Sequence, residues 1–162
     1  MIDDGSTDSS AKICEEYAKR DDRIKVFHKK NGGPASAKNL GIEKSSGEYF
    51  CILDSDDIYE MDFLAEAYKV LREGEIEVYI TGFIEEIWSG GKIIETNSYK
   101  VSTQMLLSPK EVVEKIGKEF PTCIFVSSCG ILYKSSIIKE HKIRNMDLML
   151  GEDFCFNFEV LR

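Results

Sequence analysis

The stretch that decides the fold is Tyr49-Phe50-Cys51-Ile52-Leu53-Asp54-Ser55-Asp56-Asp57, in which five apolar residues lead directly into three carboxylates. A continuous apolar run of this length, preceded by Gly47, predicts a strand that is buried on both faces of a sheet. In open α/β sheets, ligands bind just beyond the carboxyl ends of the strands. The sequence therefore predicts a binding site at Asp54, Asp56 and Asp57.

These three carboxylates repel one another unless a cation or several hydrogen-bond donors compensate their charge. Oxygen ligands separated by one residue suit Mg²⁺ or Mn²⁺, which bind one or two carboxylates together with the phosphates of a substrate. The alternative is a solvated acidic turn that caps the next helix. On these residues alone, both interpretations stay open.

Length and composition narrow the class of protein. The chain has 162 residues and a formal net charge of −8, and the length suits a single domain over residues 1–162. The negative charge argues against nucleic acid as a partner, but not against an anionic ligand held through a metal. The five cysteines form no CxxC pair, which favours reduced thiols in a cytoplasmic protein. No apolar run reaches the length of a transmembrane helix.

Strands and helices alternate along the first half of the chain. Periodicity and turn residues predict helices over about residues 9–20, 34–46 and 61–73, with strands ending near Asp4, Phe27 and Leu53. This order predicts a parallel α/β sheet with right-handed crossovers. His28, at the end of the second strand, lacks metal-ligand spacing to other residues and is expected to be a surface residue.

The second half of the chain is predicted to elaborate this sheet. The predicted elements are a strand over 76–88 with a return over 92–95, a helix beginning at Ser108, a strand over 123–133, and helices over 134–141 and 152–161. We see neither a repeat nor a linker, so a single domain is the simplest expectation.

Four short motifs, in this order, resemble those of family 2 glycosyltransferases. They are IDDGSTD at residues 2–8, NGGPASAKN at 31–39, GEY at 47–49 and LDSDD at 53–57, and GED at 151–153 resembles an acidic motif that follows in many members. The resemblance implies the GT-A fold, a Rossmann-like and mainly parallel sheet flanked by helices. It also implies a metal-dependent, inverting transfer of a sugar from a nucleoside-diphosphate sugar to an acceptor hydroxyl.

The resemblance assigns roles to the first two motifs. Asp3 and Asp4 correspond to positions that hold the base and ribose of the nucleotide, and a carboxylate there can accept a hydrogen bond from a base N–H. An Asx turn that starts the following helix is the structural alternative. Lys38 stands where the family usually has Arg near the diphosphate. Lysine keeps the positive charge but loses the bidentate fork, so a weaker phosphate contact is expected.

The two acidic motifs provide the expected metal ligands and the expected general base. The resemblance makes Asp56 the direct ligand of Mn²⁺ or Mg²⁺ and gives Asp54 to the ribose or to a water on the metal. Asp57 would support these ligands or open the next helix. Asp153, with Glu152 as the second choice, matches the general base that deprotonates the acceptor hydroxyl. Both acids also suit a helix N-terminus without any catalytic role.

The chain departs from the family pattern at its beginning. Too few apolar residues precede Asp3 for a buried strand of usual length, and the family's first strand and helix are missing. Their absence would expose strand edges, which predicts either pairing of two copies into a homodimer or a fragment with impaired donor binding. The processive-synthase signature Gln-x-x-Arg-Trp is also missing, which favours transfer of single sugars.

The resemblance also suggests binding partners, and two alternative interpretations of the function stay open. A UDP-sugar donor, a carbohydrate or lipid-linked acceptor, and a role in cell-surface polysaccharide or glycolipid synthesis are expected, in the cytoplasm or at the inner face of the membrane. One rival is a haloacid-dehalogenase-type phosphatase, because an apolar strand before Asp54-x-Asp56 also fits that motif, although Ile58 stands where Thr or Val is usual. The other rival is a truncated module that keeps the fold without catalysis.

Overall fold

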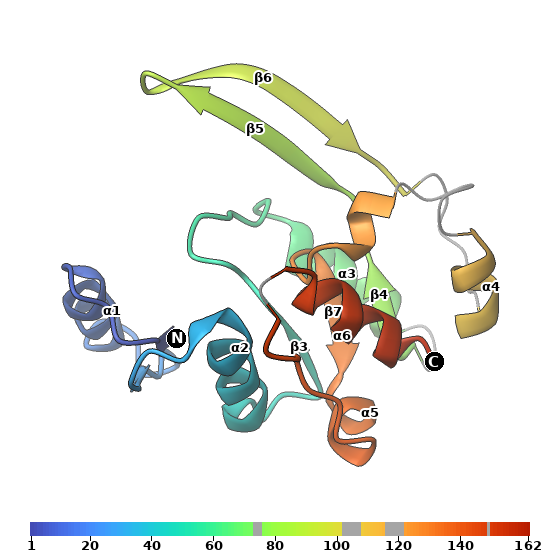
Figure 1. Ribbon diagram of the computed structural model, residues 1–162, viewed down its shortest axis with the longest axis horizontal. Helices are drawn as coiled ribbons and strands as arrows, with labels where there is room; N and C mark the ends of the chain where they lie inside the picture. Colours follow the sequence, from blue (N-terminus) through green and yellow to red (C-terminus); the bar gives the residue numbers. More distant parts are fainter. Residues whose placement is uncertain (73–75, 102–107, 116–121, 149) are drawn as a thin grey trace. The chain divides into compact units, whose positions relative to one another are not determined.

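The structure is a computed structural model that describes residues 1–72, 76–101, 108–115, 122–148 and 150–162 (Figure 1). These residues form two compact units. Unit 1 contains Met1–Ser46 and Arg144–Glu152, and unit 2 contains Gly47–Ile143 and Asp153–Arg162. The single domain expected over residues 1–162 stays a prediction.

Unit 1 is built on two short parallel strands. β1 (Ile2–Asp3) pairs with β2 (Phe27–His28), and Asp3 lies opposite His28. The chain passes from β1 to β2 through α1 (Ser10–Ala18), and α2 (Gly33–Lys44) follows β2. The parallel strand–helix–strand arrangement predicted for the beginning of the chain is confirmed. It places Asp3 and His28 together at the carboxyl ends of the two strands.

The turn after β1 requires its glycine. Gly5 has a φ of +77°, and a Cβ on it would come within 2.8 Å of the amide nitrogen of Asn31. Any other residue would be strained in this conformation and would push the two loops apart. Pro34 lies in the first turn of α2, as predicted, and Ala35 and Ile42 are the buried residues of that helix.

The sheet of unit 2 is antiparallel. β3 (Tyr49–Cys51) and β4 (Val78–Ile80) both pair with β7 (Ile131–Lys134), which lies between them. Among the described residues, parallel pairing is confined to β1–β2 and to a single bridge between Ile52 and Cys129. The detail of a mainly parallel sheet is therefore wrong for the part of the chain that the structure describes.

The apolar run at residues 49–53 is not buried on both faces as predicted. All residues of β3 are half-buried, and Leu53 is 47% exposed. The reason is that β3 has β7 as its one strand partner within the described ranges, so it lies at the edge of the sheet. The buried strand is β7, where Ile131, Leu132 and Tyr133 are all nearly inaccessible to solvent.

Helices cover this sheet and complete the core. They are α3 (Phe63–Arg72), α4 (Pro109–Lys115), α5 (Ser135–Glu140) and α6 (Glu152–Val160). Ala67 and Leu71 of α3 pack against Leu132, and the ring of Tyr133 contacts Phe156 of α6 edge-on at 5.4 Å. These helices match the predicted ones within a few residues, except that residue 73 lies outside the described part of the chain. Within that part, no helix combines the length and apolar character that a bilayer crossing needs.

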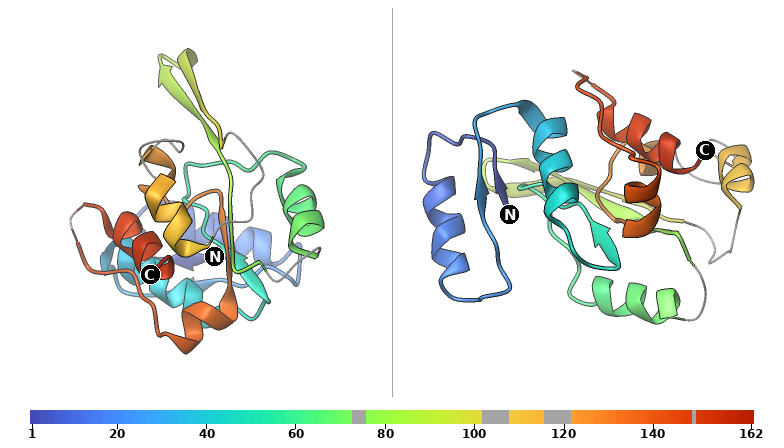
Figure 2. Two further views of the ribbon diagram at one scale, coloured as in Figure 1. Left: turned by 90° about the vertical axis from the view of Figure 1, so that its right-hand side faces the viewer. Right: turned by 90° about the horizontal axis from the view of Figure 1, so that it is seen from below.

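Two predicted strands are divided. The strand expected over 76–88 is β4 followed by β5 (Phe83–Ser89), which forms a hairpin with β6 (Lys92–Tyr99) that extends from the rest of unit 2 (Figures 1 and 2). The strand expected over 123–133 is a 3₁₀ helix (Thr122–Phe125), an irregular segment and β7. In that segment, side chains of α6 bond the backbone in place of a neighbouring strand.

Candidate active site

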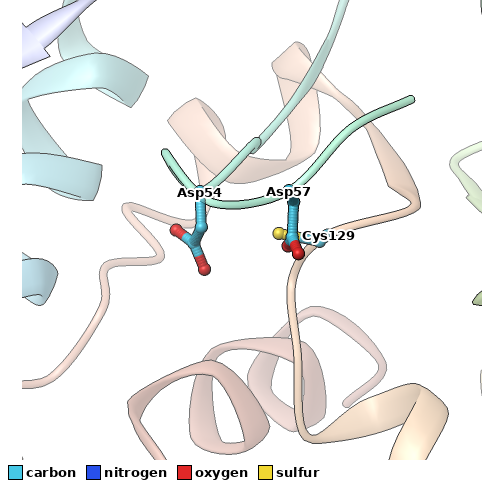
Figure 3. A group of neighbouring side chains, drawn as sticks. All are labelled: Asp54, Asp57 and Cys129. Carbon is cyan, nitrogen blue, oxygen red and sulfur yellow. The ribbon is translucent and has the colours of Figure 1, made fainter. Parts of the chain in front are cut away.

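Two carboxylates and a thiol form a group at the end of β3 (Figure 3). Asp54 and Asp57 belong to the loop after β3, and Cys129 belongs to the segment before β7. One ligand atom from each residue lies within 4.8 Å of the others. The bridge between Ile52 and Cys129 holds the two segments together beside this group.

A tight turn brings Asp54 and Asp57 close together. The backbone N–H of Asp57 donates to the carbonyl of Asp54 at 3.1 Å, which brings residues i and i+3 together. Asp56, expected to be the direct metal ligand, is exposed and is not a member of the group. Its role as a ligand stays a prediction, and the structure adds Asp57 as the neighbour of Asp54.

Cys129 is a neutral member of this group. Its burial, together with a hydrogen bond to Asp57, raises the pKa of the thiol to about 12. A protonated thiol is a poor metal ligand, because metals bind the thiolate. The two carboxylates of the group suit a hard divalent cation such as Mg²⁺ or Mn²⁺. Sequence reasoning missed Cys129, because nothing in the spacing of the cysteines connects it to the acidic loop.

The predicted base is held by the residue next to Cys129. Asp153, on α6, is 6% exposed, and Ser128 is fully buried. The hydroxyl of Ser128 donates to one oxygen of Asp153 at 3.0 Å, and the backbone N–H of Ser128 is 3.3 Å from the other oxygen. Two consecutive residues thus connect the predicted base to the acidic loop. Ser128 carries no sequence signal that could have revealed this contact.

Asn157, one turn further along α6, fixes the same segment. Its amide nitrogen donates to the carbonyls of Phe125 and Ser127, both at 3.0 Å, and its oxygen accepts from the hydroxyl of Tyr133. Asn157 is 3% exposed. A buried amide that is fully bonded rigidifies its surroundings. The signal in the sequence was a polar residue among Phe154, Cys155, Phe156 and Phe158, four positions after Asp153.

The second predicted acid belongs to unit 1. Glu152 lies 3.7 Å from the ammonium group of Lys38, and both side chains are mostly buried. Asn39, the next residue of α2, donates its amide to the carbonyl of Asn145 at 2.9 Å and accepts from the N–H of Asn145 at 2.8 Å. Lys38 and Asn39 therefore hold both ends of residues 145–152. The phosphate contact of Lys38 stays a prediction.

Asp3 is engaged at the carboxyl end of β1. It accepts hydrogen bonds from the N–H of Ser6 at 2.9 Å and from Nδ1 of His28 at 2.8 Å. The bond to His28 is the main reason that the pKa of Asp3 falls to about 2. Nε2 of His28 contacts Glu15 at 2.9 Å, and the two carboxylates raise the pKa of the imidazole. His28 is thus half-exposed but is not the simple surface residue that was expected.

Asp4 holds the loop before α2. Its carboxylate pairs with the ammonium group of Lys29 and accepts from the N–H of Gly32 at 3.0 Å. The bond to Lys29 is the largest of the effects that lower the pKa of Asp4. These contacts reach residues 29 and 32, so they give Asp4 a structural role that differs from the expected Asx turn at the start of α1. The contact of Asp4 with ribose or base stays a prediction.

Solved structures share this fold. S. aureus TarS 1–349 matches 99% of this chain and 44% of its own length, with a TM-score of 0.75 and 22% sequence identity. A structure of the same protein in complex with UDP-GlcNAc matches with a TM-score of 0.69. The chain thus has the GT-A fold of glycosyltransferases.

Sequence comparison identifies the family. Residues 1–142 match the family model described as glycosyl transferase family 2, and the chain belongs to this family. Glycosyltransferase GlyG of Streptococcus pneumoniae is 31% identical over 95% of this chain and 50% of its own length. Putative glycosyltransferase EpsH of Bacillus subtilis is 32% identical over 99% of this chain and 46% of its own length. The chain spans about half the length of these relatives. Family membership removes the support for a phosphatase.

Proposed function

We propose that this chain takes part in the inverting transfer of a sugar from a nucleoside-diphosphate sugar to an acceptor hydroxyl. The observation that carries the proposal is the pair of consecutive residues Ser128 and Cys129 in unit 2. Ser128 bonds the carboxylate of Asp153, and the thiol of Cys129 lies within 4.8 Å of carboxylate oxygens of Asp54 and Asp57. An inverting displacement needs a base for the acceptor and stabilisation of the leaving group at the same reacting carbon.

The two carboxylates of the acidic loop would hold the cation. Asp54 and Asp57 offer carboxylate oxygen atoms within 4.8 Å of each other, which fits a hard divalent cation such as Mg²⁺ or Mn²⁺. Asp56 stays a further candidate ligand from the sequence. When bound, a divalent cation neutralises the negative charge that grows on a departing diphosphate.

Asp153 is our choice for the general base. Its carboxylate would accept the proton of the acceptor hydroxyl while that oxygen forms the new bond to the sugar, and the old bond's electron pair leaves with the diphosphate. Ser128 orients the carboxylate through its hydroxyl and its N–H. Glu152 is the second choice, because it already faces the ammonium group of Lys38.

The donor contacts belong to unit 1. We assign Asp3 and Asp4 to the base and ribose and Lys38 to the diphosphate, following the resemblance of their motifs. The complex of TarS with UDP-GlcNAc supports a UDP-sugar as the first donor to try. A carbohydrate or lipid-linked acceptor and a role in cell-surface polysaccharide or glycolipid synthesis complete the proposal. A cytoplasmic setting, including the inner face of the membrane, agrees with the free Cys14, Cys51, Cys129 and Cys155.

A panel of nucleotide sugars with Mn²⁺ or Mg²⁺ tests the proposal by release of the nucleoside diphosphate. The wild-type chain should turn over one donor, and Asp153→Asn should lower the rate by about 100-fold or more, since that is the usual contribution of a general base. Asp147→Asn is the matched control, because Asp147 is an exposed aspartate six residues before Asp153 in the sequence. Absence of turnover with every donor, together with unchanged thermal melting in uridine diphosphate, would support the non-catalytic module instead.

A further inference from the structure

The carboxylate of Asp3 has a partner that the proposed function does not use. His28 lies opposite Asp3 in the register of β1 and β2, at the carboxyl ends of both strands. Nδ1 of His28 is 2.8 Å from Oδ2 of Asp3, and Nε2 is 2.9 Å from Oε1 of Glu15 on α1. The imidazole therefore bridges a buried carboxylate of β1 to an exposed carboxylate of α1.

The chemistry of this bridge fixes the protonation of His28. Ionised carboxylates only accept hydrogen bonds, so both ring nitrogens must carry protons for both bonds to exist. The charged groups packed against the imidazole are Asp3 from β1 and Glu15 from α1. The neighbouring charges at Lys29 and Asp4 pair with each other. In this arrangement His28 is an imidazolium.

We propose that His28 is a positioning residue for Asp3. The protonated imidazole of His28 orients the carboxylate of Asp3 toward the nucleotide base. This inference rests on the proposed role of Asp3 in binding the base. The carboxylate has about four acceptor positions. The N–H and the side chain of Ser6 together with Nδ1 of His28 occupy three of them, which leaves one position for an N–H of a ligand.

Loss of the proton breaks the bridge. A neutral imidazole has one N–H, so it can donate to only one of the two carboxylates, and its other nitrogen presents a lone pair to the second. The ring then loses either its bond to Asp3 or its bond to Glu15, so it no longer holds Asp3 at a fixed position relative to α1. Because both carboxylates raise the pKa of His28 above its ordinary value of 6.5, nucleotide binding should weaken as the pH rises through that raised value.

Calorimetric titration of the whole chain with uridine diphosphate and MgCl₂, from about pH 6 to about pH 8.5, tests this inference. The dissociation constant of the wild type should rise about 2- to 10-fold over this range, as expected for one lost hydrogen bond. His28→Gln should bind more weakly at low pH and show a smaller pH dependence. Titration of the diphosphate is common to both proteins and cancels in the comparison.

Two further variants sharpen the result. Glu15→Gln should move the change in affinity to lower pH, because one of the carboxylates that stabilise the imidazolium is neutralised. His141→Gln is the matched control and should keep the wild-type profile, since the pair of carboxylates contacts His28. Nitrogen-15 NMR of the free protein should show His28 titrating above its ordinary pKa of 6.5, and Asp3→Asn should lower that value.

The outcomes separate this inference from the proposed function. Parallel pH profiles for wild type and His28→Gln, with uridine diphosphate bound by both, would overturn the positioning role and leave the proposed function standing. A wild-type chain that binds no uridine diphosphate would overturn both. A His28 that titrates at or below the ordinary value in the free protein would remove the bridge itself.

Discussion

Ser128 is the residue on which the orientation of Asp153 depends. We expect Ser128→Ala to lower the turnover rate and to reduce the free energy of unfolding by about 1–3 kcal/mol, because a buried carboxylate loses one of its donors. Chemical denaturation and steady-state rates measure the two effects. Ser98→Ala, at an exposed position of β6, is the control. Wild-type values for both quantities in Ser128→Ala would show that Asp153 does not need this hydroxyl.

The contact between Asp3 and His28 makes stability depend on pH in two directions. The lowered pKa of Asp3 contributes stability above its ordinary value of 3.8, which is lost as the pH falls toward about 2. The raised pKa of His28 contributes stability below 6.5, which is lost as the pH rises through the raised value. Thermal melting across this range should show both losses in the wild type and a weaker alkaline loss in His28→Gln. An identical alkaline limb in the two proteins would contradict the contact.

At the level of elements, α2 holds residues 145–152 through Asn39. Its two hydrogen bonds reach the backbone of Asn145, so Asn39→Ala should cost about 1–3 kcal/mol of unfolding free energy, at the usual 0.5–1.5 kcal/mol per bond. Asn145→Ala keeps both bonds and removes a buried amide without partners among the described residues, so it should cost less. Chemical denaturation of both variants measures the difference. A larger loss in Asn145→Ala than in Asn39→Ala would contradict this order.

The helices and strands differ in how well they can be predicted from the residues that form them. The helices at Pro34 and Ser108 could be predicted because Pro at the first turn and a carboxylate three residues after the serine are local signals; Glu111 indeed accepts from the N–H of Ser108 at 2.8 Å. The strand expected over 123–133 could not be resolved, because Asp153 and Asn157 take the backbone groups of that segment. Such long-range competition leaves no pattern in the segment itself.

The residues of the candidate site also divide into those that the sequence predicted and those that it could not reveal. The acidic loop was predicted from the run at residues 49–57, with Asp56 as the direct metal ligand. In the structure the carboxylate beside Asp54 is that of Asp57, because a turn brings the first and fourth residues of the loop together. Cys129 and Ser128 were missed, since β7 brings them to the loop through antiparallel pairing with β3. The paired residues of β3 and β7 are 81 to 85 positions apart in the sequence. Such pairing is a property of the sheet, and neither Cys129 nor Ser128 carries a local signal.

At the scale of the whole molecule, the edge of β1 is the surface through which we expect two copies of the chain to associate. In the described part of the chain, β2 is the strand partner assigned to β1, so β1 has an edge without an assigned strand. We therefore expect the chain to form dimers at micromolar concentration, and sedimentation velocity at several concentrations measures this. A single monomeric species throughout the series would rule out pairing through β1.

The account as a whole depends on a divalent cation held by the acidic loop and bound together with the diphosphate. The most direct measurement is the affinity for uridine diphosphate, with Mn²⁺ or with a chelator, in the wild type and in Asp54→Asn. We predict tight binding only for the wild type with Mn²⁺, because the carboxylates of the loop are needed to bind the cation. Equal affinity in the chelator, or unchanged Mn²⁺-dependent affinity in Asp54→Asn, would contradict the account.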